Sequence, residues 1–134
     1  MKKSLTNPDT VARPVGTYSQ LATVEVGDAV FLYLAGQVAI DKEGNLVGQN
    51  DFPRQAEQVF ENIKAILEAS GATMDDVIKL NTYITDMTNR SELRAIYRRY
   101  FTGTPPTSTL VQVSQLASPE WLIEVEAVAV MGKE

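Results

Sequence analysis

Hydrophobic and polar positions along the chain repeat with two different periods, which predict five strands and two helices. In the stretch YSQLATVEVGDAVFLYLAGQVAI, Val24 and Val26 alternate with polar neighbours, and an apolar run follows the pair Gly27 and Asp28. This combination of alternation and turn residues is typical of a β-hairpin. Gly36 interrupts the second strand, which predicts a bulge or a close approach by a ligand or another backbone segment.

Two other stretches place apolar residues every three or four positions, as amphipathic helices do. The first predicted helix covers residues 52–70, with Asp51 as its N-cap. The second covers residues 89–103, where Asn89 and Glu92 have the spacing of a capping box.

Three further alternating segments predict strands at residues 76–86, 108–116 and 121–131. In the first of these, alternation places Ile78 with Leu80 on one side. The resulting order, β-β-α-β-α-β-β, predicts a single α+β domain over residues 1–134, a mixed sheet with two helices packed on one face.

The last predicted strand is apolar on both sides. One side carries Leu122, Glu124, Glu126, Val128 and Val130, and the other carries Ile123, Val125, Ala127, Ala129 and Met131. Because two helices on one face leave the other uncovered, the apolar residues of the uncovered face predict contact with another subunit.

Composition narrows the chemistry. The chain contains no Cys and no His, so a thiol nucleophile, Cys-ligated metals and a Ser-His-Asp triad are excluded. The net charge of −5 disfavours nonspecific binding to nucleic acid. No apolar run reaches the length of a membrane span, and the N-terminal residues lack the apolar core of a signal peptide, so a cytoplasmic location is expected.

Glu124 and Glu126 lie two positions apart on one strand, so they share one face at a spacing of about 6.6–6.8 Å. Paired carboxylates can act as acid and base when their surroundings separate their pKa values. The alternative is a polar strand edge whose glutamates are solvated or paired with arginine.

Two other features have a functional and a plain interpretation. Arg90, Arg94 and Arg98 recur every four residues on the second helix, and would form either an anion-binding ridge or a solvated face. Tyr18, near the first strand, would either present its hydroxyl to a ligand or pack with that hydroxyl satisfied.

Motifs along nearly the whole chain resemble the RidA/YjgF family, also described as L-PSP endoribonucleases. They are VGTYSQ at 15–20, LAGQVAID at 34–41, NIKAILEASGATMDDVIKLNTYITDM at 62–87, YRRYF at 97–101, PPTSTLVQV at 105–113 and IEVEAVAV at 123–130. The resemblance implies a chorismate-mutase-like fold, a homotrimer with small-molecule clefts between subunits, and hydrolytic deamination of enamines or imines without metal or cofactor.

The resemblance also implies site residues. Tyr18, Gly36 and Glu124 match the family's tyrosine, glycine and glutamate, whereas Thr107 is matched to the arginine of a PARS motif. That arginine would hold a substrate carboxylate through two charge-assisted hydrogen bonds, which a threonine cannot reproduce. The substrate preference is therefore expected to differ from that of arginine-bearing members.

The sequence leaves three functions open. In the first, a deaminase or related small-molecule hydrolase, Glu124 activates water, Tyr18 orients the substrate, backbone donors near Gly36 and Ser108 hold polar atoms, and Arg94 is a candidate substitute for the missing cation. The second is a trimer that binds a metabolite without catalysis, which the threonine at 107 favours. The third is an endoribonuclease, which the negative charge and the lack of His disfavour.

Overall fold

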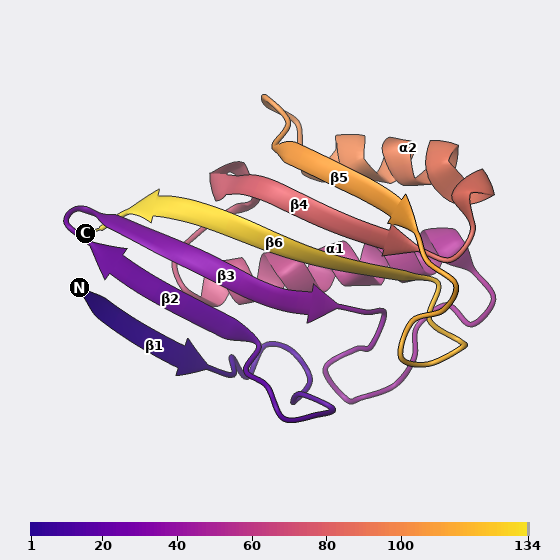
Figure 1. Ribbon diagram of the computed structural model, residues 1–134, viewed down its shortest axis with the longest axis horizontal. Helices are drawn as coiled ribbons and strands as arrows, with labels where there is room; N and C mark the ends of the chain where they lie inside the picture. Colours follow the sequence, from indigo (N-terminus) through magenta and orange to yellow (C-terminus); the bar gives the residue numbers. More distant parts are fainter. Residues whose placement is uncertain (134) are drawn as a thin grey trace.

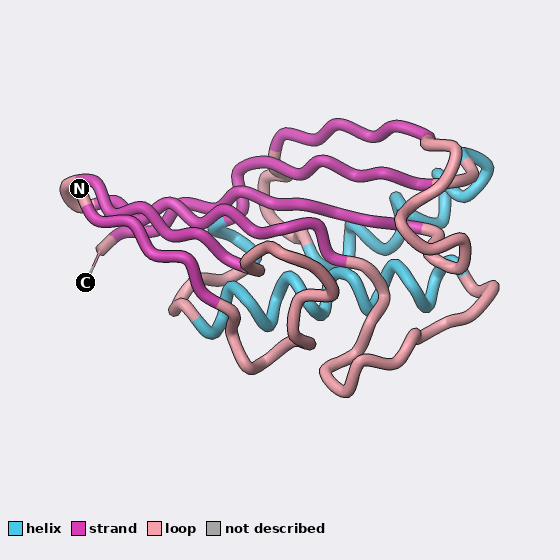
Figure 2. Tube along the Cα trace, turned by 60° about the horizontal axis from the view of Figure 1, so that its bottom comes forward, coloured by secondary structure: helices cyan, strands magenta, loops and turns pink. Residues whose placement is uncertain are grey.

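The computed structural model describes residues 1–133 as one six-stranded sheet with two helices on one of its faces (Figures 1 and 2). Across the sheet the strands follow the order β1-β2-β3-β6-β4-β5, and of these neighbours only β4 and β5 run parallel. The strands are β1 (Lys2–Thr6), β2 (Leu21–Val26), β3 (Ala29–Gln37), β4 (Val77–Ile84), β5 (Thr107–Gln112) and β6 (Ile123–Gly132). The helices are α1 (Phe52–Ala69) and α2 (Arg90–Tyr100), with short 3-10 turns η1 (Met74–Asp76) and η2 (Met87–Asn89). The predicted α+β class, with both helices on one face, is confirmed.

The predicted hairpin is formed by β2 and β3. Val26 pairs with Ala29, so Gly27 and Asp28 form a two-residue turn, and Gly27 has the positive φ of 57° that such turns require. The expected bulge is also present, because the pairing of β3 with β6 changes register between Leu34 and Gln37, on either side of Gly36.

Helix α1 begins and ends where the sequence predicts. The Asp51 side chain accepts a hydrogen bond from the Arg54 backbone N–H at 3.2 Å, which caps the first turn. Gly71 follows the helix with a φ of 86°, the left-handed conformation typical of a glycine stop. The apolar stripe of the helix is buried against the sheet and comprises Ala56, Val59, Phe60, Ile63, Ile66 and Leu67.

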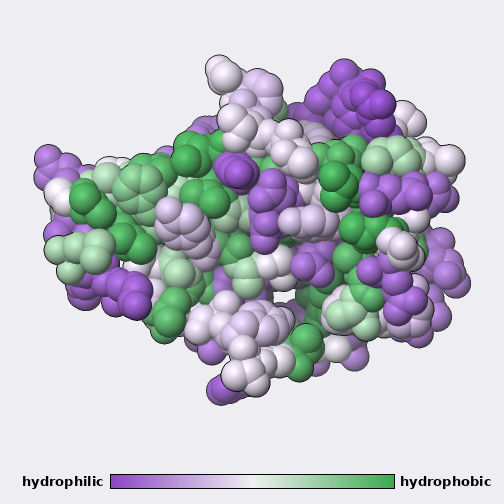
Figure 3. Space-filling model, in the orientation of Figure 1, coloured by the Kyte–Doolittle hydropathy of each residue, from purple (hydrophilic) through white to green (hydrophobic). Residues whose placement is uncertain are grey.

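The two faces of the sheet differ as the pattern of β6 predicts. Ile123, Val125, Ala127 and Ala129 are buried beneath the helices. The opposite face, here called the open face, is covered by neither helix, and Figure 3 shows apolar groups gathered across it beside a polar centre. Large apolar side chains on this face are between 39% and 61% exposed, namely Leu5, Val26, Tyr33 and Val111.

Strand β1 has no counterpart among the predicted elements. Its sequence, KKSLT, lacks an apolar alternation, yet it pairs with β2 along its whole length. An edge strand buries little, and lysines on it discourage pairing with other chains, so a polar sequence is compatible with this position.

Two local expectations are wrong. Ile78 is 48% exposed and does not share the buried side of Leu80, because β4 changes register against β6 between Val77 and Lys79. Asn89 makes no side-chain capping bond at the start of α2. The chain already turns helically at η2, which is capped from further upstream when Asp86 accepts from the Thr88 backbone N–H at 2.9 Å.

Within residues 1–133 no helix is both long enough and apolar enough to cross a membrane.

Candidate functional site

Two carboxylates lie on the open face of β6, at the centre of the sheet. Register places Glu124 opposite Tyr83 and Glu126 opposite Asn81 of β4. Glu126 Oε1 accepts hydrogen bonds from Asn81 Nδ2 at 2.9 Å and from the Tyr83 hydroxyl at 3.1 Å. Glu126 is therefore fixed by its neighbours, whereas the Glu124 carboxylate accepts no hydrogen bond from residues 1–133.

The surroundings of Glu124 also change the acidity of its carboxyl. Burial, the larger cause, raises the pKa of the Glu124 carboxyl above its ordinary value, and the nearby charge of Glu126 raises it further. The pKa of Tyr83 is also raised, by burial first and then by its hydrogen bond to Glu126 and the charges of both glutamates. A carboxyl whose pKa lies above the usual range suits proton transfer nearer neutral pH.

The Glu124 carboxylate lies against the backbone of Gly36. A Cβ on Gly36 would fall 2.2 Å from Glu124 Oε2 and 2.9 Å from its carboxyl carbon. Only glycine leaves this space free, so the bulge in β3 and the absence of a side chain together admit the carboxylate.

Tyr18 reaches the same bulge from the loop that connects β1 and β2. Its ring is partly exposed and lines, together with Gly36 and Gln37, a small cavity of about 30 Å³. Gly36 is therefore shared by two of the predicted residues: the Glu124 carboxylate lies against it, and it lines the cavity beside Tyr18.

Arg94 and Ser108 belong to a different hollow, on the helix-covered side of the sheet. It has a volume of about 380 Å³ and lies between α2 and the start of β5. Its lining is mostly apolar and includes Leu80, Tyr97, Phe101, Pro105 and Pro106. Arg94 and Arg98 also line it, and within residues 1–133 neither forms an ion pair.

Thr107 lines neither the cavity beside Tyr18 nor the hollow beside Arg94. It is the first residue of β5, opposite Lys79 on the open face, and its Oγ1 donates a hydrogen bond to the Ile78 carbonyl at 2.8 Å. The register puts it two strands and four positions from Glu124, a separation of roughly 16 Å. Thr107 and Ser108 thus face opposite sides of the sheet, and it is Ser108 that shares a hollow with Arg94.

Comparisons with known proteins agree with this architecture. Residues 10–131 match the sequence model of the family described as Endoribonuclease L-PSP. A RutC family protein of Pyrococcus abyssi is 37% identical over 129 residues, which cover 96% of this chain and 98% of that protein. The chain belongs to the RidA/YjgF family.

Solved structures of the RidA/YjgF family share the fold over almost their full length. RidA of an Antarctic Psychrobacter is 36% identical with a TM-score of 0.83, covering 96% of this chain and 99% of that one. Escherichia coli TdcF, crystallised with bound serine, is 30% identical with a TM-score of 0.82, covering 96% and 98%.

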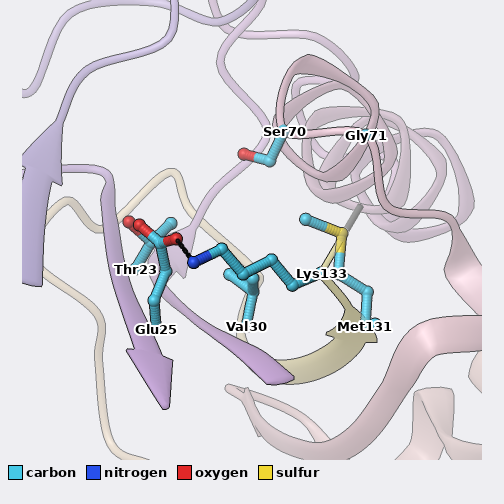
Figure 4. A pocket seen from close by; sticks show the side chains of 8 residues that line it. Thr23, Glu25, Val30, Ser70, Gly71, Met131 and Lys133 are labelled. Atoms are coloured by element: carbon cyan, nitrogen blue, oxygen red, sulfur yellow. Dashed lines mark ion pairs between the residues drawn. The ribbon is translucent and has the colours of Figure 1, made fainter. Parts of the chain in front are cut away.

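A larger hollow of this RidA/YjgF protein lies at the far end of the sheet, beside the end of α1 (Figure 4). Its volume is about 560 Å³, and its charged groups are Glu25 and Lys133, which pair with each other at 3.3 Å. Lys2 approaches the same carboxylate at 3.9 Å. Because its carboxylate is already paired with ammonium groups, this hollow offers weaker recognition of a charged ligand than the groups around Glu124.

The sequence motifs did not reveal the residues that hold the site in place. Asn81 and Tyr83 hold Glu126, and the buried Gln20 and Gln37 line the cavity beside Tyr18. The sequence contained one indication of their role. Asn81 and Tyr83 are two positions apart, so they share the side of β4 opposite its buried residues, which is the side that meets the glutamates of β6.

Proposed function

We propose that this protein is a hydrolytic deaminase of a small imine or enamine. The observation that carries the proposal is the position of the Glu124 carboxylate, which lies over Gly36 on the open face with a raised pKa and no hydrogen-bond donor among residues 1–133. A carboxylate in this state is free to accept a proton from water, and family membership supports a small-molecule role of this kind.

The reaction needs only water and one proton-transfer group. Glu124 takes a proton from a water molecule as the water oxygen bonds to the imine carbon, and the proton passes to the nitrogen. The hydroxyl of the resulting carbinolamine then gives its proton to Glu124, which passes it to the amino nitrogen as the C–N bond breaks, so ammonia leaves and the carbonyl product forms. Tyr18 orients the substrate beside Glu124. At the end of the reaction Glu124 is again ionised.

We place the reaction in clefts between the subunits of a homotrimer. The exposed apolar side chains of the open face support contact with another copy, since a monomer would leave them in water. In this arrangement one subunit contributes Tyr18, Gly36 and Glu124, and its neighbour contributes its β5 edge, beside which the hollow with Arg94 and Ser108 lies. A cleft built in this way accounts for the separation of the two groups within one protomer.

Neither Thr107 nor Ser108 can supply the charge of an arginine. The Thr107 hydroxyl already donates to Ile78, so it is not available as a donor to a substrate carboxylate. Arg94, which has no ion-pair partner within residues 1–133 and borders the hollow that contains Ser108, is the group best placed to offer a cation instead. We therefore expect an altered substrate preference, for which the serine bound to TdcF suggests a small ligand of amino-acid type.

The threonine at position 107 favours a second candidate, a trimer that binds a metabolite without turning it over. Loss of both hydrogen bonds of an arginine clamp would weaken carboxylate binding by a few powers of ten, at about 1.5–3 kcal/mol for each charge-assisted bond. A protein that has lost this contact can keep its cleft and lose its chemistry. The endoribonuclease description of the family draws no support from this chain, which has a net charge of −5 and no His.

The test is hydrolysis of 2-aminoacrylate and iminopropionate by the purified protein, followed as ammonia release, beside Glu124→Gln. Turnover that disappears in the variant supports the deaminase. Saturable binding of an amino or imino acid with no turnover would establish the second candidate instead.

A further inference from the structure

We propose that Gln37 is a positioning residue of the candidate site, and that together with Gln20 it fixes Tyr18 and the Gly36 bulge relative to Glu124. This inference rests on the proposed function for its kinetic consequence, but its structural part can be tested without turnover. Neither glutamine touches the site from the open face, and both are buried.

Gln37 uses both hydrogens of its side-chain amide. One is donated to the Ala35 carbonyl at 3.1 Å and the other to Gln20 Oε1 at 2.8 Å. Ala35 and Gln37 flank Gly36, so the first bond closes the bulge across the glycine over which the Glu124 carboxylate lies. The second bond leaves the strand and reaches the connection between β1 and β2.

Gln20 ties that connection at several points. Its Nε2 donates to the Ala12 carbonyl at 3.3 Å, and its backbone N–H donates to Asn7 Oδ1 at 2.9 Å. Its carbonyl accepts from the Ala35 N–H at 2.9 Å. Tyr18 lies two residues before Gln20, so these bonds anchor the backbone beside it.

Two amides in this position favour one geometry over others. A buried amide without partners costs roughly 1–3 kcal/mol, so any loop arrangement that separates the two glutamines is penalised. An apolar pair would fill the same space without selecting the relative position of loop and strand. The two side chains make three hydrogen bonds, and satisfied buried amides of this kind make their surroundings rigid.

The experiment uses the full chain labelled with 3-fluorotyrosine and observed by 19F NMR. The chain has five tyrosines, and the Tyr18 resonance is assigned by its loss in Tyr18→Phe. The variants are Gln37→Met, Gln20→Met and the double substitution, since methionine keeps the length of the side chain and removes its hydrogen bonds.

The matched control is Gln55→Met. Gln55 is another fully buried glutamine, which donates to the carbonyls of Gly48 and Glu120 and accepts from the Leu122 N–H at 2.8 Å. None of these bonds reaches residues 7–20, so the control reproduces the loss of a buried amide without acting on the Tyr18 loop.

If the glutamine pair positions Tyr18, its resonance shifts or broadens in both single variants while the Tyr97 and Tyr100 resonances stay in place. The double variant then changes no further than the singles, and kcat for imine hydrolysis falls at least about tenfold below that of the control at matched loss of Tm. An unchanged Tyr18 resonance in both single variants overturns the inference. An equal change of the Tyr18 resonance in Gln55→Met also overturns it, because the effect would then follow from the loss of any buried amide.

Failure of one variant to fold leaves the decision with the other, since each breaks the same bond from a different element. Should the wild type hydrolyse no imine, the deaminase proposal fails, and the NMR result still decides whether the two glutamines hold Tyr18.

Discussion

The carboxylate of Glu124 and the backbone of Gly36 are in direct contact, close enough that a single methyl group on Gly36 would displace Oε2. The contact joins β6 to the bulge of β3, and it explains why a glycine lies near the end of that strand. A substitution at Gly36 is therefore the most direct way to displace the Glu124 carboxylate while keeping Glu124 in the chain.

Gly36→Ala is expected to change activity more than stability. The methyl group meets the end of a flexible side chain, so Glu124 can rotate away at small cost, but it then leaves the position in which it would meet substrate. A misplacement of about 1 Å can cost on the order of 10²-fold in rate. Steady-state kinetics and thermal unfolding measure the two effects separately.

The control for that substitution is Gly132→Ala, since a Cβ at Gly132 meets nothing within 4 Å and its φ is not positive. Equal kinetic losses in both alanine variants would contradict the role given to the Gly36 contact.

Glu124→Gln is expected to stabilise the protein at neutral pH. The folded state raises the pKa of Glu124, so as pH rises the unfolded state releases this proton first and the folded state loses stability between the two pKa values. Glutamine lacks this penalty. The difference in Tm between variant and wild type should therefore be positive at pH 7 and shrink toward zero below about pH 4.

Glu68→Gln, at an exposed position on α1, provides the comparison. A wild type that is more stable than Glu124→Gln at pH 7 would show that the Glu124 carboxylate is favourably bonded and not strained by burial.

Glu126→Gln is expected to shift the acidic limb of the pH–rate profile to lower pH. The Glu126 charge contributes to the raised pKa of Glu124, and its removal makes the proposed base easier to ionise. The amide oxygen of the introduced glutamine can still accept from Asn81 and Tyr83, so the geometry is kept. A profile that stays in place would mean that Glu124 is not the group whose ionisation limits the rate.

Ser108→Arg is expected to gain activity on imines that carry a carboxylate, and Thr107→Arg is not. The two side chains face opposite sides of the sheet, and only Ser108 lines the hollow beside Arg94. One charge-assisted hydrogen bond contributes about 1.5–3 kcal/mol, so kcat/KM should rise about tenfold or more. A gain confined to Thr107→Arg would locate the carboxylate site on the open face instead.

Tyr33→Lys is expected to break the proposed trimer. Tyr33 is nearly half exposed on the open face, where a subunit interface would bury the introduced charge. Light scattering coupled to size-exclusion chromatography should show a smaller species, whereas Ala69→Lys, with the same charge at an exposed site on α1, should not. A wild type that is monomeric at all concentrations would remove the basis for clefts between subunits.

Much of this fold could be predicted from the sequence because its signals are local. The alternation along β6 gives both faces of the sheet correctly, and Asp51 and Gly71 mark the ends of α1. The elements that were missed depend on contacts distant in sequence. Strand β1 is visible only through its pairing with β2, and the exposure of Ile78 follows from a register change against β6.

In the candidate site, too, local motifs could be predicted from the sequence, and contacts between distant residues could not. Motif matching indicated Tyr18, Gly36 and Glu124; the structure shows Glu124 against Gly36, and Tyr18 and Gly36 lining one small cavity. It could not reveal that Thr107 and Ser108, adjacent in sequence, face different sides, because that depends on how β5 is aligned with β4. Nor could it identify Gln20 and Gln37, whose pairing joins positions seventeen residues apart.

The position of β6 bears on how the protein is made. It is the last strand in sequence order, yet it lies between β3 and β4 and joins the two halves of the sheet. During synthesis, β1–β3 and the β4–α2–β5 unit leave the ribosome without the strand that connects them. Until β6 is synthesised, both halves have unpaired strand edges. In this period the chain is most exposed to aggregation and to binding by chaperones. Because Glu124 is carried by that final strand, the nascent chain acquires its proposed catalytic group only at the moment when the sheet closes.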